Sequence, residues 1–452
     1  MKRKIIVLMS AIALLSSAPV WAQSNVMNLK QILDYAIKHN QDASKARLEA
    51  ENGRYVTNEV RAQALPQING NASLTDNLIK PRFVLPGTLA GRPGENIIVE
   101  SGTTWNAAAG VSLSQQLFNQ SVFTGLKAAK VGEDFYQLSA ALTEEQVIEQ
   151  VASAYYQLLV NQEQVAVIDA NLNNVIQLQK TIASQYENGL VKKTDRDRVQ
   201  VNLTNLQTQK QQLTDGIRQM ENMLKFYMGM PLNTAVSFER IPLNDLSKEI
   251  VPVKEETVNA DNITSFVLLK KQRELLTLQK KAYQAEYYPS LSLSGNYSYN
   301  GLSDKFDLFK TANTSAFWYD MASVGLTLRV PIFDGNARGS KVKQANIALL
   351  KIDQDLSTTQ QSVDLAYQNA SIQMSNSINT IRVQEANVKL ANEVYQTTQS
   401  NYKNGLANLT DLLNSESSMV EAQNSYNQAL LNYKLAEIQL IKSQGKIKTL
   451  NQ

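Results

Sequence analysis

One turn sequence occurs twice in this chain, and the spacing between its copies continues well beyond the turn. The segment "YENGLVKKTD" occupies residues 186–195, and "YKNGLANLTD" occupies residues 402–411. Three pairs of identical residues are each 216 positions apart: Gly189 and Gly405, Asp195 and Asp411, and Gly229 and Gly445. Self-similarity at one fixed period is the signature of a repeat architecture. The sequence therefore predicts two tandem repeats, over residues 23–230 and 260–452, with a linker over 231–259 that forms a belt outside the helices.

The N-terminus has the pattern of an export signal. Lys2, Arg3 and Lys4 precede an apolar run over residues 5–15, and small residues lead up to Ala22. A basic start, a short apolar run and small residues before a cleavage point are typical of a secretory signal peptide. We expect residues 1–22 to be removed and the mature chain to be exported without a helical membrane anchor.

Most of the chain shows helical periodicity. From Leu138 to Tyr186 the apolar residues recur mostly in steps of three and four, which predicts a long helix with a narrow apolar seam, as in a coiled coil. This helix is expected over 119–188, and a counterpart over 334–404. Four shorter helices are expected over 28–64, 195–229, about 262–287 and 411–445. The helices over 28–64 and 195–229 together have nearly as many residues as the long helix over 119–188. This match suggests that the two shorter helices stack end to end as one broken column.

Four segments alternate with period two instead. Apolar and polar residues alternate around 68–78, 105–117, 290–299 and 318–332, which predicts strands with one apolar and one polar face. Each is about as long as a transmembrane β-strand. Trp105 and Trp318 stand near the start of the second strand of each hairpin, as expected of an aromatic girdle at the lipid interface.

Four strands are too few to enclose water. Even small barrels need about eight strands, so the chain must oligomerise if its strands form a barrel. Two copies would give a barrel with a filled interior, whereas three would give twelve strands and room for a channel. The intervening segments 79–102 and 301–316 are expected to be extracellular loops.

Several other functions find no support in the composition. The net charge of +3 falls to about zero without the three basic residues of the signal, which disfavours nucleic acid as a partner. The chain has no cysteine, and His39 is its single histidine, so a histidine-based metal cluster is excluded. The mixed charges of "KKTDRDR" at 192–198 indicate a solvated or partner-facing surface. No phosphate loop, zinc spacing or nucleophile motif occurs. We therefore expect no cofactor, no metal site and no enzyme activity.

In order and spacing, the motifs resemble the outer membrane efflux proteins, the family of TolC-like channel-tunnels. The resemblance covers nearly the whole mature chain. Its elements are "NLKQILDYAIKHN" at 28–40, "ALPQING" at 64–70, "YYPSLSLSGNYSY" at 287–299, "PIFDGNARGSKVKQA" at 331–345 and the two "NGL" turns. No one of these is specific, but their duplicated order is.

The resemblance implies a mostly α-helical α+β membrane protein. Three protomers would form a 12-stranded β-barrel in the outer membrane, with four strands from each, continued by a long α-helical barrel in the periplasm. Such a homotrimer is a passive conduit that contacts outer-membrane lipid. It docks onto a periplasmic adaptor, a membrane fusion protein, which couples it to an inner-membrane transporter of the RND or ABC type. The cargo and the transporter class are left open.

The resemblance also assigns roles to the repeated turns, which would form the periplasmic tips. The adaptor-docking positions carried over to this chain are Gly189, Leu190, Thr194, Asp195, Gly405, Leu406, Thr410 and Asp411. Locally, the glycines are expected to end one helix in the left-handed conformation, and Thr or Asp to cap the next. The pore gate would comprise Asp411, Tyr402 and Asp195. Asn408 and Asn414 depart from the charged residues that the best-known member has there, so the gate is expected to be less charged.

The residues alone leave open a second hypothesis, in which the protein is not a channel. A soluble coiled-coil protein of the periplasm or the surface, structural or adaptor-like, could carry the hairpins as a small cap. The duplication of membrane-length strands argues against it.

Overall fold

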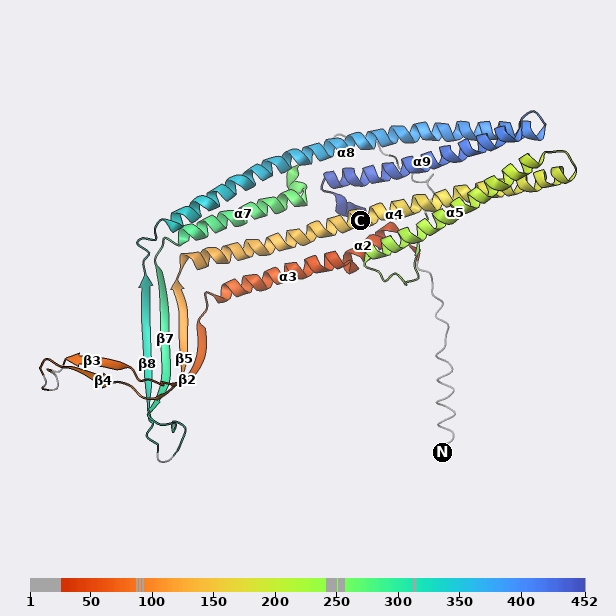
Figure 1. The fold of residues 1–452 in the computed structure, drawn as a ribbon. Coiled ribbons are helices and arrows are strands. Elements are labelled where there is room, and N and C mark those ends of the chain that lie inside the picture. The colour runs from red at the N-terminus through yellow and green to blue at the C-terminus, as the bar shows by residue number, and fades with distance from the viewer. Residues whose placement is uncertain are drawn as a thin grey trace, which may run out of the picture. The chain divides into compact units, whose positions relative to one another are not determined.

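The computed structural model describes residues 26–86, 88, 91, 93–240, 250, 257–311 and 314–451. The predicted signal peptide and much of the linker over 231–259 lie outside the described residues. Helices predominate, and strands are concentrated in one part of the chain (Figure 1). The helices are α2 (Leu29–His39), α3 (Gln41–Ala62), α4 (Gln120–Glu187), α5 (Lys193–Met228), α7 (Thr264–Ala285), α8 (Ala337–Lys403) and α9 (Leu409–Ser443), with 3-10 turns η2 (Ala260–Asn262) and η3 (Ile447–Asn451).

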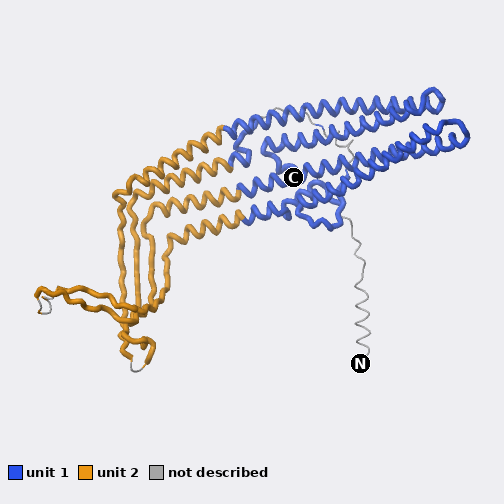
Figure 2. Tube along the Cα trace, viewed as in Figure 1, with its two compact units in different colours: residues 1–48, 138–267, 358–452 blue, residues 49–137, 268–357 orange. Residues whose placement is uncertain are grey.

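The chain divides into two compact units (Figure 2). Unit 1 comprises residues 1–48, 138–267 and 358–452, and unit 2 comprises 49–137 and 268–357. The strands of unit 2 are β2 (Gln67–Asp76), β3 (Arg82–Pro86), β4 (Asn96–Glu100), β5 (Trp105–Phe118), β7 (Ser290–Ser303) and β8 (Phe317–Arg329). Unit 1 contains β1 (Val26–Met27) and β6 (Ser237–Phe238).

All four predicted membrane-length strands are present, and they form one antiparallel sheet in the order β2-β5-β7-β8. Val111 lies between Gly70 on β2 and Tyr297 on β7, and Tyr297 in turn faces Ala322 on β8. This register puts the predicted apolar residues on one face. Asn71, Ser112 and Asn296 belong to the opposite, polar face. The period-two pattern thus predicted both the strands and their sidedness.

The segments predicted as loops are partly strand. Within 79–102, β3 and β4 form an antiparallel hairpin that is separate from the four-stranded sheet. The pairs Phe83–Val99 and Leu85–Ile97 lie opposite each other there. The second predicted loop, 301–316, is also too long, because β7 continues to Ser303. Prediction of these segments as loops throughout is therefore wrong.

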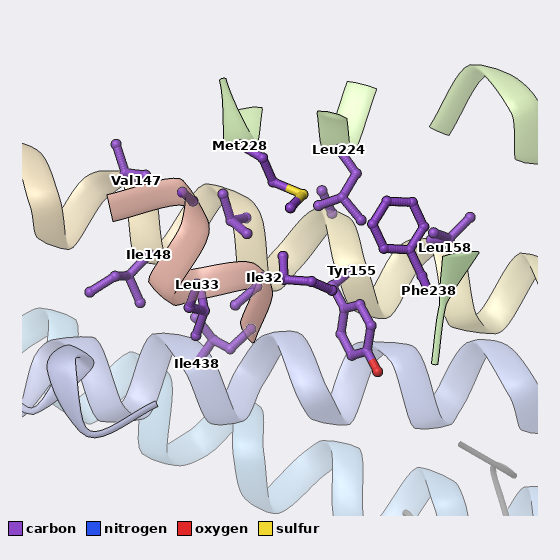
Figure 3. Packing of buried hydrophobic residues seen from close by; sticks show 14 of the residues in the cluster. Ile32, Leu33, Val147, Ile148, Tyr155, Leu158, Leu224, Met228, Phe238 and Ile438 are labelled. Atoms are coloured by element: carbon purple, nitrogen blue, oxygen red, sulfur yellow. The ribbon is translucent and has the colours of Figure 1, made fainter. Parts of the chain in front are cut away.

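The core of unit 1 is built around the middle of α4. Ile32 and Leu33 of α2, Tyr155 and Leu158 of α4, and Leu224 of α5 are almost fully buried in one cluster (Figure 3). Phe238 of β6 enters the same cluster. β6 pairs in parallel with β1, so the described start of the linker is packed into the core rather than lying wholly outside the helices.

The predicted helix over 28–64 is broken at Asn40, so the prediction of one continuous helix is wrong. Asn40 has an extended backbone, and its side-chain oxygen accepts hydrogen bonds from the N–H groups of Asp42 (2.8 Å) and Ala43 (3.0 Å). Its Nδ2 donates to the Tyr227 carbonyl at the end of α5 (2.8 Å). The side chain therefore caps α3 and ties the break to α5.

Two helices of unit 1 end in the same way. Gly229 caps α5 and Gly445 follows α9, each with φ of 72°. A methyl group at Gly229 would lie 2.2 Å from the His39 carbonyl oxygen, and one at Gly445 would lie 2.4 Å from the Asn262 carbonyl oxygen. Each helix therefore ends against the backbone of another segment, where no side chain fits.

No helix among the described residues combines the length and the apolar character needed to cross a membrane.

The end of α5 generates a stability prediction. Gly229→Ala should lower the midpoint of thermal unfolding of the purified protein, because the left-handed conformation costs an L-residue about 1–2 kcal/mol and the added methyl group clashes with His39. Gly216→Ala is the control within the same helix, since no atom lies within 4 Å of the added methyl group. It should raise stability by about 0.5–1 kcal/mol. Circular dichroism measures both; equal midpoints for the two variants would contradict the proposed steric role.

Candidate functional site: the two helical tips

The two repeated sequences form turns with the same backbone hydrogen bonds. In the first turn, the Gly189 N–H donates to the Tyr186 carbonyl (2.9 Å), and the Leu190 N–H donates to the Gln185 carbonyl (2.8 Å). In the second turn, Gly405 donates to Tyr402 (3.0 Å) and Leu406 to Asn401 (2.8 Å).

The glycines have φ of 70° and 74°, as predicted for a left-handed helix end. Both turns are Schellman motifs. We refer to residues 186–195 as tip 1 and to 402–411 as tip 2.

The surface of each tip is open. Leu190 is 73% exposed and Leu406 is 78% exposed, although both are apolar. No atom lies within 4 Å of a methyl group placed on Gly189 or Gly405. Each tip therefore presents an exposed leucine next to a glycine whose backbone no side chain covers.

The caps of the following helices differ from the prediction and from each other. Lys192 is the N-cap of α5 and makes no side-chain capping bond. Asn408 is the N-cap of α9: its side chain accepts from the Asp411 N–H (2.9 Å), and the Asp411 carboxylate accepts from the Asn408 N–H (3.3 Å). The expectation that Thr or Asp would cap these helices is therefore wrong. Asp411 instead completes a capping box from the third helical position.

The two tips belong to one packed region of unit 1. Arg198 of α5 donates from Nη1 to the Thr410 hydroxyl (2.7 Å). Leu409 packs with Val199 and Leu203 of α5, and Tyr402 lies against the same cluster. The predicted site residues Thr410 and Tyr402 are thereby brought next to the helix that follows tip 1.

Two of the three predicted gate residues are coupled electrostatically. Burial raises the pKa of Tyr402, and the charge of Asp195 raises it further. Among the described residues, Asp411 is hydrogen-bonded to Asn408 rather than to either of these two. The structure thus brings Tyr402 and Asp195 together, and it holds the exposed Asp411 on the first turn of its own helix.

The charged run at 192–198 contains one internal ion pair. Arg196 forms an ion pair with Asp197 (2.8 Å), and its guanidinium lies 4.5 Å from the centroid of the Tyr186 ring. Lys192 and Lys193 are exposed. This arrangement fits a solvated surface.

A buried carboxyl group near tip 2 was not anticipated. Glu416 is only 3% exposed, its Oε2 has no hydrogen-bond partner, and burial raises its pKa to about 7. One signal was available in the sequence. Glu416 continues the seam of α9 in steps of three and four residues after Leu409 and Leu412, which predicts an inward-facing side chain.

Trp105 and Trp318 lie at the loop end of the sheet in unit 2. The Trp105 ring centroid is 4.7 Å from that of Phe306, and Trp318 stacks on Tyr299 at 4.9 Å. The Trp318 indole N–H donates to the Leu308 carbonyl (3.2 Å). An aromatic cluster therefore stands at one end of the apolar face. In the described part of the chain, no group of three or more His, Cys, Asp or Glu side chains is placed to hold a metal ion.

Comparison with known proteins identifies a family. The family model described as "Outer membrane efflux protein" matches residues 32–230 and 269–446. The chain is 23% identical over 450 residues to outer membrane protein TolC of Vibrio cholerae, covering 97% of this chain and 94% of the relative. It is 24% identical over 330 residues to the alkaline protease secretion protein AprF of Pseudomonas aeruginosa, covering 72% and 66%.

The fold is also found among solved structures. The outer membrane protein VceC from Vibrio cholerae matches with a TM-score of 0.72 at 16% identity, over 92% of this chain and 96% of that one. The match supports the mostly helical α+β fold.

Proposed function

The chain belongs to the outer membrane efflux protein family, and on this basis we propose that it is the outer-membrane channel of a tripartite export system. In this system a homotrimer conducts substrate from a periplasmic adaptor and an inner-membrane transporter, of the RND or ABC type, to the exterior. The observation that carries the proposal is the four-stranded sheet, which has one apolar face and two open edges. The soluble coiled-coil alternative is set aside because the matching relatives are outer-membrane and secretion proteins.

The edges of the sheet support a trimer. β2 pairs only with β5, and β8 only with β7, within the described sheet. Unpaired strand edges are not tolerated in hydrocarbon, where each unsatisfied backbone group costs several kcal/mol. If β8 of one protomer pairs with β2 of the next, three protomers close a barrel of twelve strands, which is wide enough for a water-filled channel.

The faces of the sheet fit that arrangement. Val324, Leu326 and Leu328 of β8 alternate with polar or small residues and are between 64% and 82% exposed. On the other face, Asn69, Ser112 and Asn296 are hydrophilic. The first set would face lipid and the second would line the channel.

Helix α8 presents a second uncovered surface. Leu365, Ile372, Val383, Leu390 and Val394 are each about half exposed or more. At 3.6 residues per turn they lie within about 40° of the helix circumference. This straight apolar stripe is not covered by any other part of the described chain. It fits a heterologous interface, which closes into a ring when it is repeated about a threefold axis.

We further propose that the chain consists of two structural repeats, over 23–230 and 260–452, joined by an equatorial linker over 231–259. The matched hydrogen bonds of the two tips support this division. The matched helix ends at Gly229 and Gly445 support it as well.

The tips are the proposed docking surface for the adaptor. Leu190 and Leu406 are exposed apolar side chains beside open glycines, a combination that suits the close approach of a partner's backbone. Thr194, Asp195, Thr410 and Asp411 would contribute the polar part of the same surface. The channel itself would be passive, since the relatives are channel proteins rather than enzymes.

For the gate, the proposal assigns different tasks to the three residues. Tyr402 and Asp195 would hold the two tips together. Asp411 would supply the charge, because three exposed carboxylates around one axis concentrate negative potential at a constriction. The neutral Asn414, one turn further, leaves this ring without a second charged layer.

The first prediction concerns location and assembly. The protein should fractionate with outer membranes and migrate as a trimer in unheated detergent gels, converting to a monomer on boiling. Chemical cross-linking of intact cells provides an independent count of copies. A monomer recovered in the soluble periplasmic fraction would contradict the channel proposal.

The second prediction concerns docking. Gly189→Val and Gly405→Val should impair export while leaving trimers in the membrane, because a β-branched residue resists the left-handed conformation of the tips. Gly102→Val is the matched control: Gly102 also has a positive φ of 87° and no atom within 4 Å of an added methyl group, but it lies in a loop of unit 2. Normal export by the tip variants, or equal loss in the control, would count against docking at the tips.

The third prediction concerns the gate. Asp411→Asn should weaken the block of single-channel current by multivalent cations in planar bilayers, since it removes the charge but keeps an oxygen that can complete the capping box. Asp197→Asn, an exposed aspartate in the charged run after tip 1, should leave the block unchanged. If Asp411→Asn retains the full block, Asp411 is not part of the gate.

A further inference from the structure

Charged side chains are rare in the four-stranded sheet of unit 2. Its strands β2, β5, β7 and β8 contain three of them, which are Asp76, Asp320 and Arg329. Asp76 lies opposite Trp105 in the register of β2 and β5. Asp320 lies opposite Tyr299 in the register of β7 and β8. Both carboxylates therefore belong to the apolar face, at the loop end of the sheet.

Arg329 belongs to the other, polar face. It is the last residue of β8 and lies opposite Ser290, the first residue of β7. Side chains alternate between the faces along a strand, so Arg329 shares its face with the next such pair, Thr327 and Ser292. The remaining residues of the polar face are uncharged and mostly Ser, Asn, Gln or Thr. This face thus carries one charge, which is positive and stands at the end of β8.

The charge of Arg329 is not neutralised by a close partner. Its side chain is exposed, and it makes no ion pair or hydrogen bond with any part of the chain that the structure describes. It lines an open hollow of about 560 Å³ at the junction of the sheet and the helices. The other cations of this hollow are paired, Arg338 with Asp334 (2.6 Å) and Lys341 with Glu286 (2.9 Å). Arg329 is therefore available to a solute.

The proposed trimer, on which this inference rests, would multiply the charge. Each protomer would contribute one Arg329 at the same level of the barrel, where β8 leads into α8 (Figure 1). Across the protomer boundary β8 would face β2. The residues of β2 on the polar face are all uncharged: Gln67, Asn69, Asn71, Ser73 and Thr75. Whatever register these edges adopt, β2 brings no carboxylate to the guanidinium on this face.

The size of the barrel decides whether such a ring affects passing ions. Twelve strands, about 4.8 Å apart and tilted by about 40°, give a circumference of about 75 Å and a radius of about 12 Å. Arginine side chains project inward from this radius, so their charges come within one Debye length of the axis at 0.1 M salt, which is about 10 Å. A ring of cationic side chains attracts anions and repels cations.

We propose that Arg329 determines the charge selectivity of the barrel, where three copies form a cationic ring that favours anionic solutes over cationic ones. The cargo class that the ring suits is small anions and organic acids. The ring belongs to unit 2, whereas the tips and the proposed gate at Asp411 belong to unit 1.

The test measures the reversal potential of the full-length protein in planar bilayers under a KCl gradient. Asp411→Asn is the parent chain for all variants, so that the carboxylates of the proposed gate do not contribute. Arg329→Gln should lower the chloride-to-potassium permeability ratio at least about twofold near 0.1 M salt, as expected from three screened charges about 10 Å from the axis. Near 1 M, where the Debye length is about 3 Å, the difference should disappear.

Two further variants separate the ring from a structural role. Adding Ser290→Arg to Arg329→Gln moves the charge to the adjacent strand on the same face and level, and it should restore the permeability ratio. A residue that only stabilised the end of β8 would not be replaced in this way. Lys310→Gln makes the same change of charge in the loop on the apolar side, where the adjacent Phe309 contacts Trp318. It should leave the ratio unchanged.

Equal permeability ratios in Arg329→Gln and its parent would overturn the inference. The same holds for an equal change in Lys310→Gln, or for a double variant that conducts normally but does not regain the ratio. Absence of any conductance in the unaltered protein would overturn the channel proposal and this inference with it. Conductance without a change of selectivity would overturn this inference alone.

Discussion

The backbone N–H and C=O groups along the outer edges of β2 and β8 have no partner strand in the described sheet. In an apolar medium these groups must be paired, so the sheet is incomplete in one copy of the chain. Its exposed apolar face is unfavourable in water, and its unpaired edge groups are unfavourable in an apolar medium. Closing the edges with further copies solves both, because a closed barrel leaves no free edge and separates lipid from water. The proposed assembly follows from this requirement.

The helices meet a related limit. The buried residues of α4 form a seam that α2, α5 and α9 cover in part, as Ile148, Tyr155 and Ile168 show. α8 keeps a separate stripe of apolar residues in solvent. A helix with one covered and one uncovered apolar stripe fits the proposed boundary between copies. Sheet and helices thus support the proposed assembly on independent grounds, the first through backbone hydrogen bonds and the second through side-chain burial.

Sequence periodicity predicted those features that depend on local pattern. The four long strands and the long helices have clear periods, and the tip glycines follow from the need for a left-handed residue. Asn40 shows where this reasoning stops. Its neighbours read as helix on both sides, but its side chain has hydrogen-bond partners on α3 and on α5, and the second partner is 187 positions away.

The cap of α9 was ambiguous, since Asn408, Thr410 and Asp411 are all good capping residues. The seam spacing of α9 turns Glu416 inward, but the extent of its burial depends on packing between helices, which the spacing does not give. The β3–β4 hairpin was overlooked for a different reason: each strand is only five residues long, and Gly and Pro residues separate the two.

The ends of α5 and α9 limit how such a chain can change in length. Because Gly229 abuts the His39 carbonyl and Gly445 abuts that of Asn262, neither helix can extend beyond its present last turn. A residue inserted in α5 rotates the part of α5 between the insertion and tip 1 by about 100° and moves it about 1.5 Å along the helix axis. The partner helix of the coiled coil, α4, is not changed by this insertion. Only matched insertions in both helices, in whole heptads, preserve their contacts. The reach of the tips is therefore expected to vary between relatives in discrete steps, and always in both helices of a pair.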